Sequence, residues 1–177
     1  MGLLDNIFGK KKDKNIRVER DEANPENVVV YAKVSDGTSQ GISIEELESL
    51  TQEADEILDS TDLGKISMYT NNLLSKGAYD EMIAFSHQVI EKYPNTNAVG
   101  NSYNFMGVAC FFKKDYQNAI HYYIKAMENG MDKMMMDDNV WEAVEIIYKQ
   151  TKDKTVLEDY KHYFPNGEYI KKANKLL

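Results

Sequence analysis

The stretch GNSYNFMGVACFFKKDYQNAIHYYIKAMENGMDK, residues 100–133, decides the fold of this chain. On both sides of the polar turn at 113–115, apolar residues recur at the three- and four-residue spacing of amphipathic helices. Asp115 is expected to cap the second helix, because a carboxylate accepts the unpaired N–H groups of a first turn. Gly107 and Ala119 are small, so we expect the two antiparallel helices to approach closely there. The stretch therefore predicts a helical hairpin.

Seven positions of this hairpin match the spacing of the pattern W-x2-L-G-x2-Y…A-x3-F…A, and six of them are conservative matches. The seven positions are Tyr103, Met106, Gly107, Cys110, Ala119, Tyr123 and Ala126. Cys110 departs from the pattern, in which tyrosine is usual at that position. The chain therefore resembles a tetratricopeptide-repeat protein over about 62–177. The resemblance implies a protein-binding module without catalytic activity, in which the first helix of each pair lines a concave groove.

Weaker copies of the same unit flank the clear one. One repeat earlier, Thr70 and Ser86 stand where the pattern has a glycine and an aromatic residue. The further helices are expected at 62–76, 78–93, 138–150, 155–164 and 168–176. Terminal repeats are often atypical because one side of them is capped. We expect a mainly α fold, an α-α superhelix of tetratricopeptide type with about three helix pairs and a C-terminal capping helix.

The first part of the chain has a different character. A β-branched run, VVVYAKV, precedes an Asp-Gly turn, which predicts a small β-hairpin at about 28–43. A Ser-x-x-Glu capping box then begins a helix at about 44–59. We expect three segments: a basic, flexible tail at 1–27, the hairpin and acidic helix at 28–61, and the helical repeats at 62–177.

The opening sequence MGLLDNIFGKKK combines a short apolar face with a lysine cluster. Interfacial helices use this combination, because apolar side chains enter the headgroup boundary while lysines meet anionic lipid. The residues of a membrane contact would be Leu3, Leu4, Ile7, Phe8, Lys10, Lys11 and Lys12. The sequence favours a disordered tail without a function over this membrane contact, and a tail that docks on another part of the protein is the third alternative.

Charge and composition restrict the partners. The 29 acidic residues exceed the 21 basic ones, and the formal net charge is −8. The body of the chain lacks the clustered lysine and arginine that nucleic acid requires, so we expect no nucleic-acid partner. A single cysteine permits no internal disulfide, which favours the cytoplasm. No apolar run approaches the roughly 20 residues that span a bilayer.

Motifs for catalysis are missing from the sequence. It contains no glycine-rich phosphate loop, HExxH or GxSxG, and its histidines and cysteine are not spaced as metal ligands. We therefore expect no enzyme, no cofactor and no metal site. Cys110 lies between apolar residues and is expected to be a buried, unreactive thiol.

The resemblance implies a partner-binding groove with an amide-rich and acidic lining. By register its residues are Asn71, Asn101, Asn104, Phe111, Asp138, Glu142 and Glu145. Asparagine can donate to and accept from a peptide backbone, and carboxylates attract lysine or arginine. We expect an extended or basic peptide or protein as the partner. Three alternatives remain: a membrane-peripheral factor that works through its N-terminal segment, an immunity- or antitoxin-like protein that masks a basic partner, and asparagines that are merely solvated.

Overall fold

A computed structural model of the chain describes residues 16–20, 28–33 and 39–177, with side chains from residue 52 onward. The chain divides into two compact units, which comprise residues 1–62 and residues 63–177. The backbone of the first unit forms a three-stranded antiparallel sheet in the order β1-β2-β3, followed by a helix. These elements are β1 (Ile16–Arg20), β2 (Val28–Lys33), β3 (Ser39–Ser43) and α2 (Ile44–Asp59).

The central strand of this sheet pairs with both neighbours. Val30 of β2 lies opposite Val18 of β1 and Ile42 of β3. The acidic helix expected at about 44–59 coincides with α2. The turn that would close the hairpin at 28–43 falls on residues 34–38, outside the described part, so the hairpin stays a prediction. Residues 1–15 and 21–27 of the expected tail also lie outside it.

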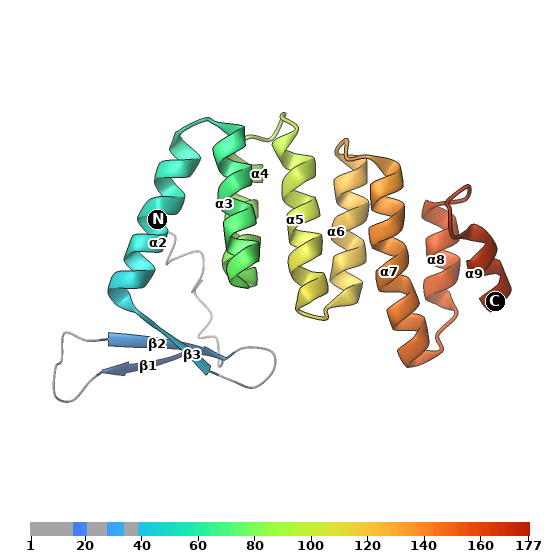
Figure 1. Ribbon diagram of the computed structural model, residues 1–177, viewed down its shortest axis with the longest axis horizontal. Helices are drawn as coiled ribbons and strands as arrows, with labels where there is room; N and C mark the ends of the chain where they lie inside the picture. Colours follow the sequence, from blue (N-terminus) through green and yellow to red (C-terminus); the bar gives the residue numbers. More distant parts are fainter. Residues whose placement is uncertain (1–15, 21–27, 34–38) are drawn as a thin grey trace. The chain divides into compact units, whose positions relative to one another are not determined.

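The second unit is helical throughout its length, which confirms the mainly α prediction for the described residues. Each helix packs against the next one in sequence, and α3 also contacts α5, so that the helices stand side by side in Figure 1. They are α3 (Leu63–Lys76), α4 (Tyr79–Lys92), α5 (Ala98–Phe112), α6 (Tyr116–Glu128), α7 (Lys133–Thr151), α8 (Thr155–Tyr163) and α9 (Ile170–Leu176). The largest departure from the predicted bounds is at α7, which begins earlier because the Asp132 side chain accepts a hydrogen bond from Met135 N at 2.9 Å.

Small residues bring α5 and α6 together. A Cβ atom added to Gly107 would lie 2.5 Å from Cδ1 of Tyr123, so a larger residue fits only if the Tyr123 ring or the helices shift. Ala119 and Ala126 of α6 are completely buried. Asp115 caps α6 as predicted, because its carboxylate accepts a hydrogen bond from Asn118 N at 3.3 Å. Sequence reasoning therefore identified the packing of this pair correctly.

The ends of α3 and α5 have the same hydrogen-bond geometry but different residues. Gly77 follows α3 with φ +71°, and Ala78 N donates to Leu73 O at 2.9 Å. After α5 the equivalent bond joins Asp115 N to Cys110 O, and the left-handed residue is Lys114 with φ +63°. A residue with a side chain is less favourable in this conformation than glycine.

Large aromatic residues and one buried acid fill the α7–α8 pair. Trp141 of α7 packs edge-on against Tyr160 of α8, with ring centroids 5.0 Å apart, and Phe164 stacks beside Tyr160. Asp137 is only 5% exposed, and its carboxylate accepts hydrogen bonds from Tyr160 Oη at 2.5 Å and Glu168 N at 2.7 Å. These bonds compensate for the removal of the carboxylate from water. Burial, together with the bond to Asp137, raises the pKa of Tyr160.

Candidate protein-binding face

The structure brings two asparagines together across consecutive first helices. Asn104 of α5 accepts a hydrogen bond from Asn139 Nδ2 of α7 at 3.5 Å, and both side chains are half-buried. A bond of this length is weak, and each amide keeps further donors and acceptors. Sequence analysis did not place Asn139 in the site. The signal was available, because Asn139 follows Asn104 by 35 residues, about one repeat.

The other two predicted asparagines lie on α3 and α5. Asn71 is exposed on α3 and donates to Ser67 O of its own helix at 2.9 Å. Asn101 is half-buried, one turn before Asn104 on α5. Each of the helices α3, α5 and α7 therefore presents at least one amide at its surface.

The predicted carboxylates of α7 divide into two groups. Glu142 is exposed, and its charge contributes, after burial, to the raised pKa of Tyr123 on α6. Within the described part of the chain no ion pair involves Glu142. Asp138 and Glu145 are instead contacted from the C-terminal segment: Tyr169 Oη donates to Asp138 Oδ1 at 3.0 Å, and Lys172 Nζ lies 2.6 Å from Glu145 Oε1. Glu142 is the carboxylate that is available to a ligand.

Glu145 is also paired with Lys149 of its own helix, at 3.1 Å. The hydrogen bond from Lys172 is the main cause that lowers the pKa of Glu145, so this carboxyl group stays ionised. The structure therefore places Asp138 and Glu145 in contact with the C-terminal segment.

Phe111 belongs to the packing between helices. Its ring is half-buried and lies edge-on to Tyr116 of α6, with centroids 5.4 Å apart. The neighbouring Phe112 is 56% exposed and stacks on Tyr79 of α4. Of these two phenylalanines, the one that sequence analysis left out is the more accessible.

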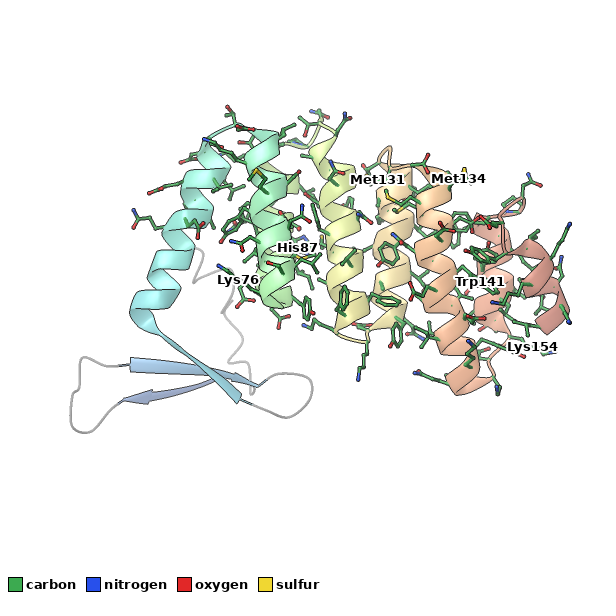
Figure 2. All side chains as sticks on the ribbon, in the orientation of Figure 1. Lys76, His87, Met131, Met134, Trp141 and Lys154 are labelled. Atoms are coloured by element: carbon green, nitrogen blue, oxygen red, sulfur yellow. The ribbon has the colours of Figure 1, made fainter. Side chains whose placement is uncertain are left out.

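Groups with reactive chemistry are scarce in the described residues. Cys110 is buried, and burial is the main cause that raises the pKa of its thiol to about 11, which keeps it protonated and unreactive at neutral pH. Across residues 52–177, no group of three or more histidine, cysteine or acidic side chains could hold a metal ion. Trp141 and Lys154 lie toward the C-terminal end of the second unit in Figure 2.

The predicted membrane contact, from Leu3 to Lys12, lies outside the described residues. Among the helices that are described, none combines the length and the apolar character required to cross a bilayer. Comparison of the chain with protein-family models, curated proteins and solved structures finds no match.

Proposed function

We propose that the second unit is a helical repeat of the tetratricopeptide type and that it binds a segment of another protein without catalysis. The binding face consists of the surfaces of α3, α5 and α7, the first helices of three successive pairs. The packing of each helix on the next one and the small residues between α5 and α6 support this assignment.

The observation that carries the proposal is the amide pair of Asn104 and Asn139, which joins α5 and α7. Asn71 adds a third amide on α3. A carboxamide donates and accepts at once, so amides on successive helices can bind the N–H and C=O groups of an extended backbone. Because these bonds do not depend on the partner's side chains, they fix the position of the peptide and not its identity.

The negative charge of the chain favours a partner with basic residues. Glu142 is exposed on α7, three residues after Asn139, and the chain as a whole has a formal net charge of −8. A carboxylate that faces solvent attracts lysine or arginine over several ångströms and increases the rate of encounter. We therefore propose a basic, extended segment as the ligand.

A peptide library tests the proposal. Random decapeptides displayed against the immobilised full chain are expected to be enriched in lysine and arginine, and the selected peptides are then measured by biolayer interferometry. Asn104→Ala should increase the dissociation rate roughly 5- to 100-fold, since an unpaired backbone group costs about 1–3 kcal/mol. Glu142→Lys should mainly slow association, and added salt should reduce that effect.

Asn95→Ala is the matched control, because Asn95 is exposed in the loop between α4 and α5. It should bind like the wild type. If Asn104→Ala and Glu142→Lys also bind like the wild type, the face of α3, α5 and α7 is not the binding site. The sheet of the first unit and the N-terminal tail would then be tested next.

A further inference from the structure

The C-terminal segment presents two side chains to one stripe of α7. Tyr169 and Lys172 lie three residues apart, and they contact Asp138, Trp141 and Glu145, which are spaced by three and four residues along α7. The Tyr169 ring stacks on the indole of Trp141 with centroids 5.2 Å apart and an interplanar angle of 4°. Lys172 Nζ lies 5.2 Å from the centroid of the same indole while it pairs with Glu145. We call Asp138, Trp141 and Glu145 the Trp141 face.

The Trp141 face combines one aromatic ring with two carboxylates. An indole lies between two carboxylates, one on the preceding turn of α7 and one on the following turn. An indole attracts both a stacked ring and a cation, and the carboxylates accept from a phenol and from an ammonium group. The face therefore fits a segment in which an aromatic residue stands just before the first turn of a helix and lysine or arginine follows three residues later, as Tyr169 and Lys172 do.

The segment that covers the face is short and lies at the C-terminal end of the second unit. The helix α9 has seven residues, too few to be stable alone, and Ala173 is its only fully buried residue. The ion pair to Glu145 is accessible to water, because the Lys172 side chain is 51% exposed. The chain before α9 is held more firmly, since Glu168 N bonds to the buried carboxylate of Asp137. Two further hydrogen bonds hold the segment, from Tyr169 N to Tyr160 Oη at 3.2 Å and from Tyr148 Oη of α7 to Leu176 O at 3.3 Å. Local opening of the residues after Glu168 must break these bonds but leaves the bond of Glu168 to Asp137 in place.

We propose that the Trp141 face is a docking site for a segment of another protein, and that Tyr169 together with α9 is its intramolecular occupant. The partner carries an aromatic residue followed three positions later by lysine or arginine, and it binds in the place of α9. This rests on the proposed function only in that the ligand is again a protein segment with basic residues. The site itself is separate, because Asn104, Asn139 and Glu142 have no described contact with α9.

Trp141 is the single tryptophan of the chain, so its fluorescence reports on this face alone. In the full chain, the double variant Tyr169→Ala with Lys172→Ala should detach α9. Quenching of Trp141 by acrylamide is expected to increase at least twofold, while far-ultraviolet circular dichroism shows that the other helices persist. Lys171→Ala with Lys175→Ala is the matched control, because both lysines are exposed on α9 and have no described contact with α7.

A synthetic peptide of residues 168–177 serves as the ligand in the second part of the test. It should bind the Tyr169→Ala, Lys172→Ala chain at least tenfold more tightly than the wild type, in which the tethered α9 competes at a local concentration of order 1 mM. Peptides with Ala at position 169 or Glu at position 172 should bind at least tenfold more weakly. Lys172→Ala alone, which removes one exposed ion pair, should give a smaller gain of about threefold and should fold normally.

Two results would overturn the proposal. Unchanged quenching in the folded double variant would mean that α9 does not cover Trp141. Increased quenching without binding of the peptide up to about 1 mM would mean that the uncovered face is not a docking site. Neither result depends on Asn104 or Glu142, so failure here is distinguishable from failure of the peptide-binding function.

Discussion

The α5–α6 pair and the α7–α8 pair are both antiparallel helix hairpins, but they are held together differently. At α5–α6 the helices approach each other at Gly107, which lies against the Tyr123 ring, and the facing alanines are completely buried. At α7–α8 the space between the helices is filled by Trp141 and Tyr160, and a buried carboxylate joins the pair.

The contrast teaches that one arrangement of helices does not require one packing chemistry. Small residues let backbones approach and stabilise a pair by close contact, and an added side chain is costly there. Aromatic residues bury more surface, but the hydroxyl and amide groups near them need hydrogen-bond partners. We therefore expect the first pair to be sensitive to added volume and the second to be sensitive to the loss of polar partners.

The largest expected effect is that of Gly107→Leu. The new side chain would meet the Tyr123 ring, and we expect the free energy of unfolding to fall by about 3 kcal/mol or more. The melting temperature should fall by about 10 °C. Gly130→Leu is the control, since a Cβ at Gly130 meets no atom within 4 Å and only the backbone, at φ +93°, is strained. Similar losses in both variants would show that close approach at Gly107 is not what stabilises the pair.

Asp137→Ala is the corresponding change in the α7–α8 pair. It leaves Tyr160 Oη and Glu168 N without their acceptor, and each unpaired buried group costs about 1–3 kcal/mol. We expect a loss of about 2–3 kcal/mol in urea unfolding. Asp138→Ala, which removes an exposed partner of Tyr169, should cost below about 1 kcal/mol. An equal loss in the two variants would argue against a special role of the buried carboxylate.

The packing of the α5–α6 pair could be predicted from the sequence, but the contacts of Asp137 in the α7–α8 pair could not. Gly107, Ala119 and Asp115 were found because small residues and caps occur at fixed spacings. The contacts of Asp137 were not, since they join residues 23 and 31 positions apart that follow no repeat.

For the candidate face, the expected register of the helices led to Asn104 and Glu142. The structure places Asn104 in a hydrogen bond with Asn139 and Glu142 at an exposed position, and whether they bind a partner stays a prediction. The same register also grouped Asp138 and Glu145 with them, although Tyr169 and Lys172 contact these two carboxylates. Which segment covers a charged side chain is decided by the tertiary packing, and a periodic pattern does not contain that information.

Tyr160→Phe tests the polar contacts of the α7–α8 pair through the pH dependence of the free energy of unfolding. At neutral pH the variant should lose about 1–2 kcal/mol, because Asp137 loses a donor and Tyr169 N loses an acceptor. The raised pKa of Tyr160 in the folded chain means that the unfolded chain ionises first, near pH 10, so the wild type loses stability as the pH rises further.

The gap between wild type and Tyr160→Phe should therefore narrow by about 1 kcal/mol between pH 8 and pH 11, as measured by urea unfolding. The difference isolates Tyr160, because every other group titrates in both proteins. A gap that stays constant or widens would contradict the environment described for this hydroxyl.

The smallest expected effect extends the comparison to the α3–α4 pair. Ser86 of α4 is buried, and its hydroxyl has no hydrogen-bond partner among the described residues. Ser86→Ala should raise the free energy of unfolding by about 0.5–1 kcal/mol, because it removes an unpaired polar group and improves helix propensity. Ser75→Ala is the control at an exposed helical serine whose hydroxyl donates to Asn72 O at 2.8 Å, and it measures the gain in helix propensity less the loss of that exposed bond. A loss of stability in Ser86→Ala would indicate that the hydroxyl does have a partner.

The left-handed residues at the ends of the helices have a consequence for the evolution of the chain. Lys114 and Lys152 adopt φ +63° and +59° at the ends of α5 and α7, the conformation that Gly77 adopts after α3. Glycine at Lys114 would relieve a conformational cost of about 1 kcal/mol, whereas at Lys152 the gain would be partly offset by loss of the contact between Lys152 Nζ and the Tyr148 ring, 5.5 Å from its centroid. Selection has left this gain unused, as expected where a protein only has to remain above a stability threshold. A more heat-resistant form is therefore accessible through the turns alone, with both faces of the repeats left as they are.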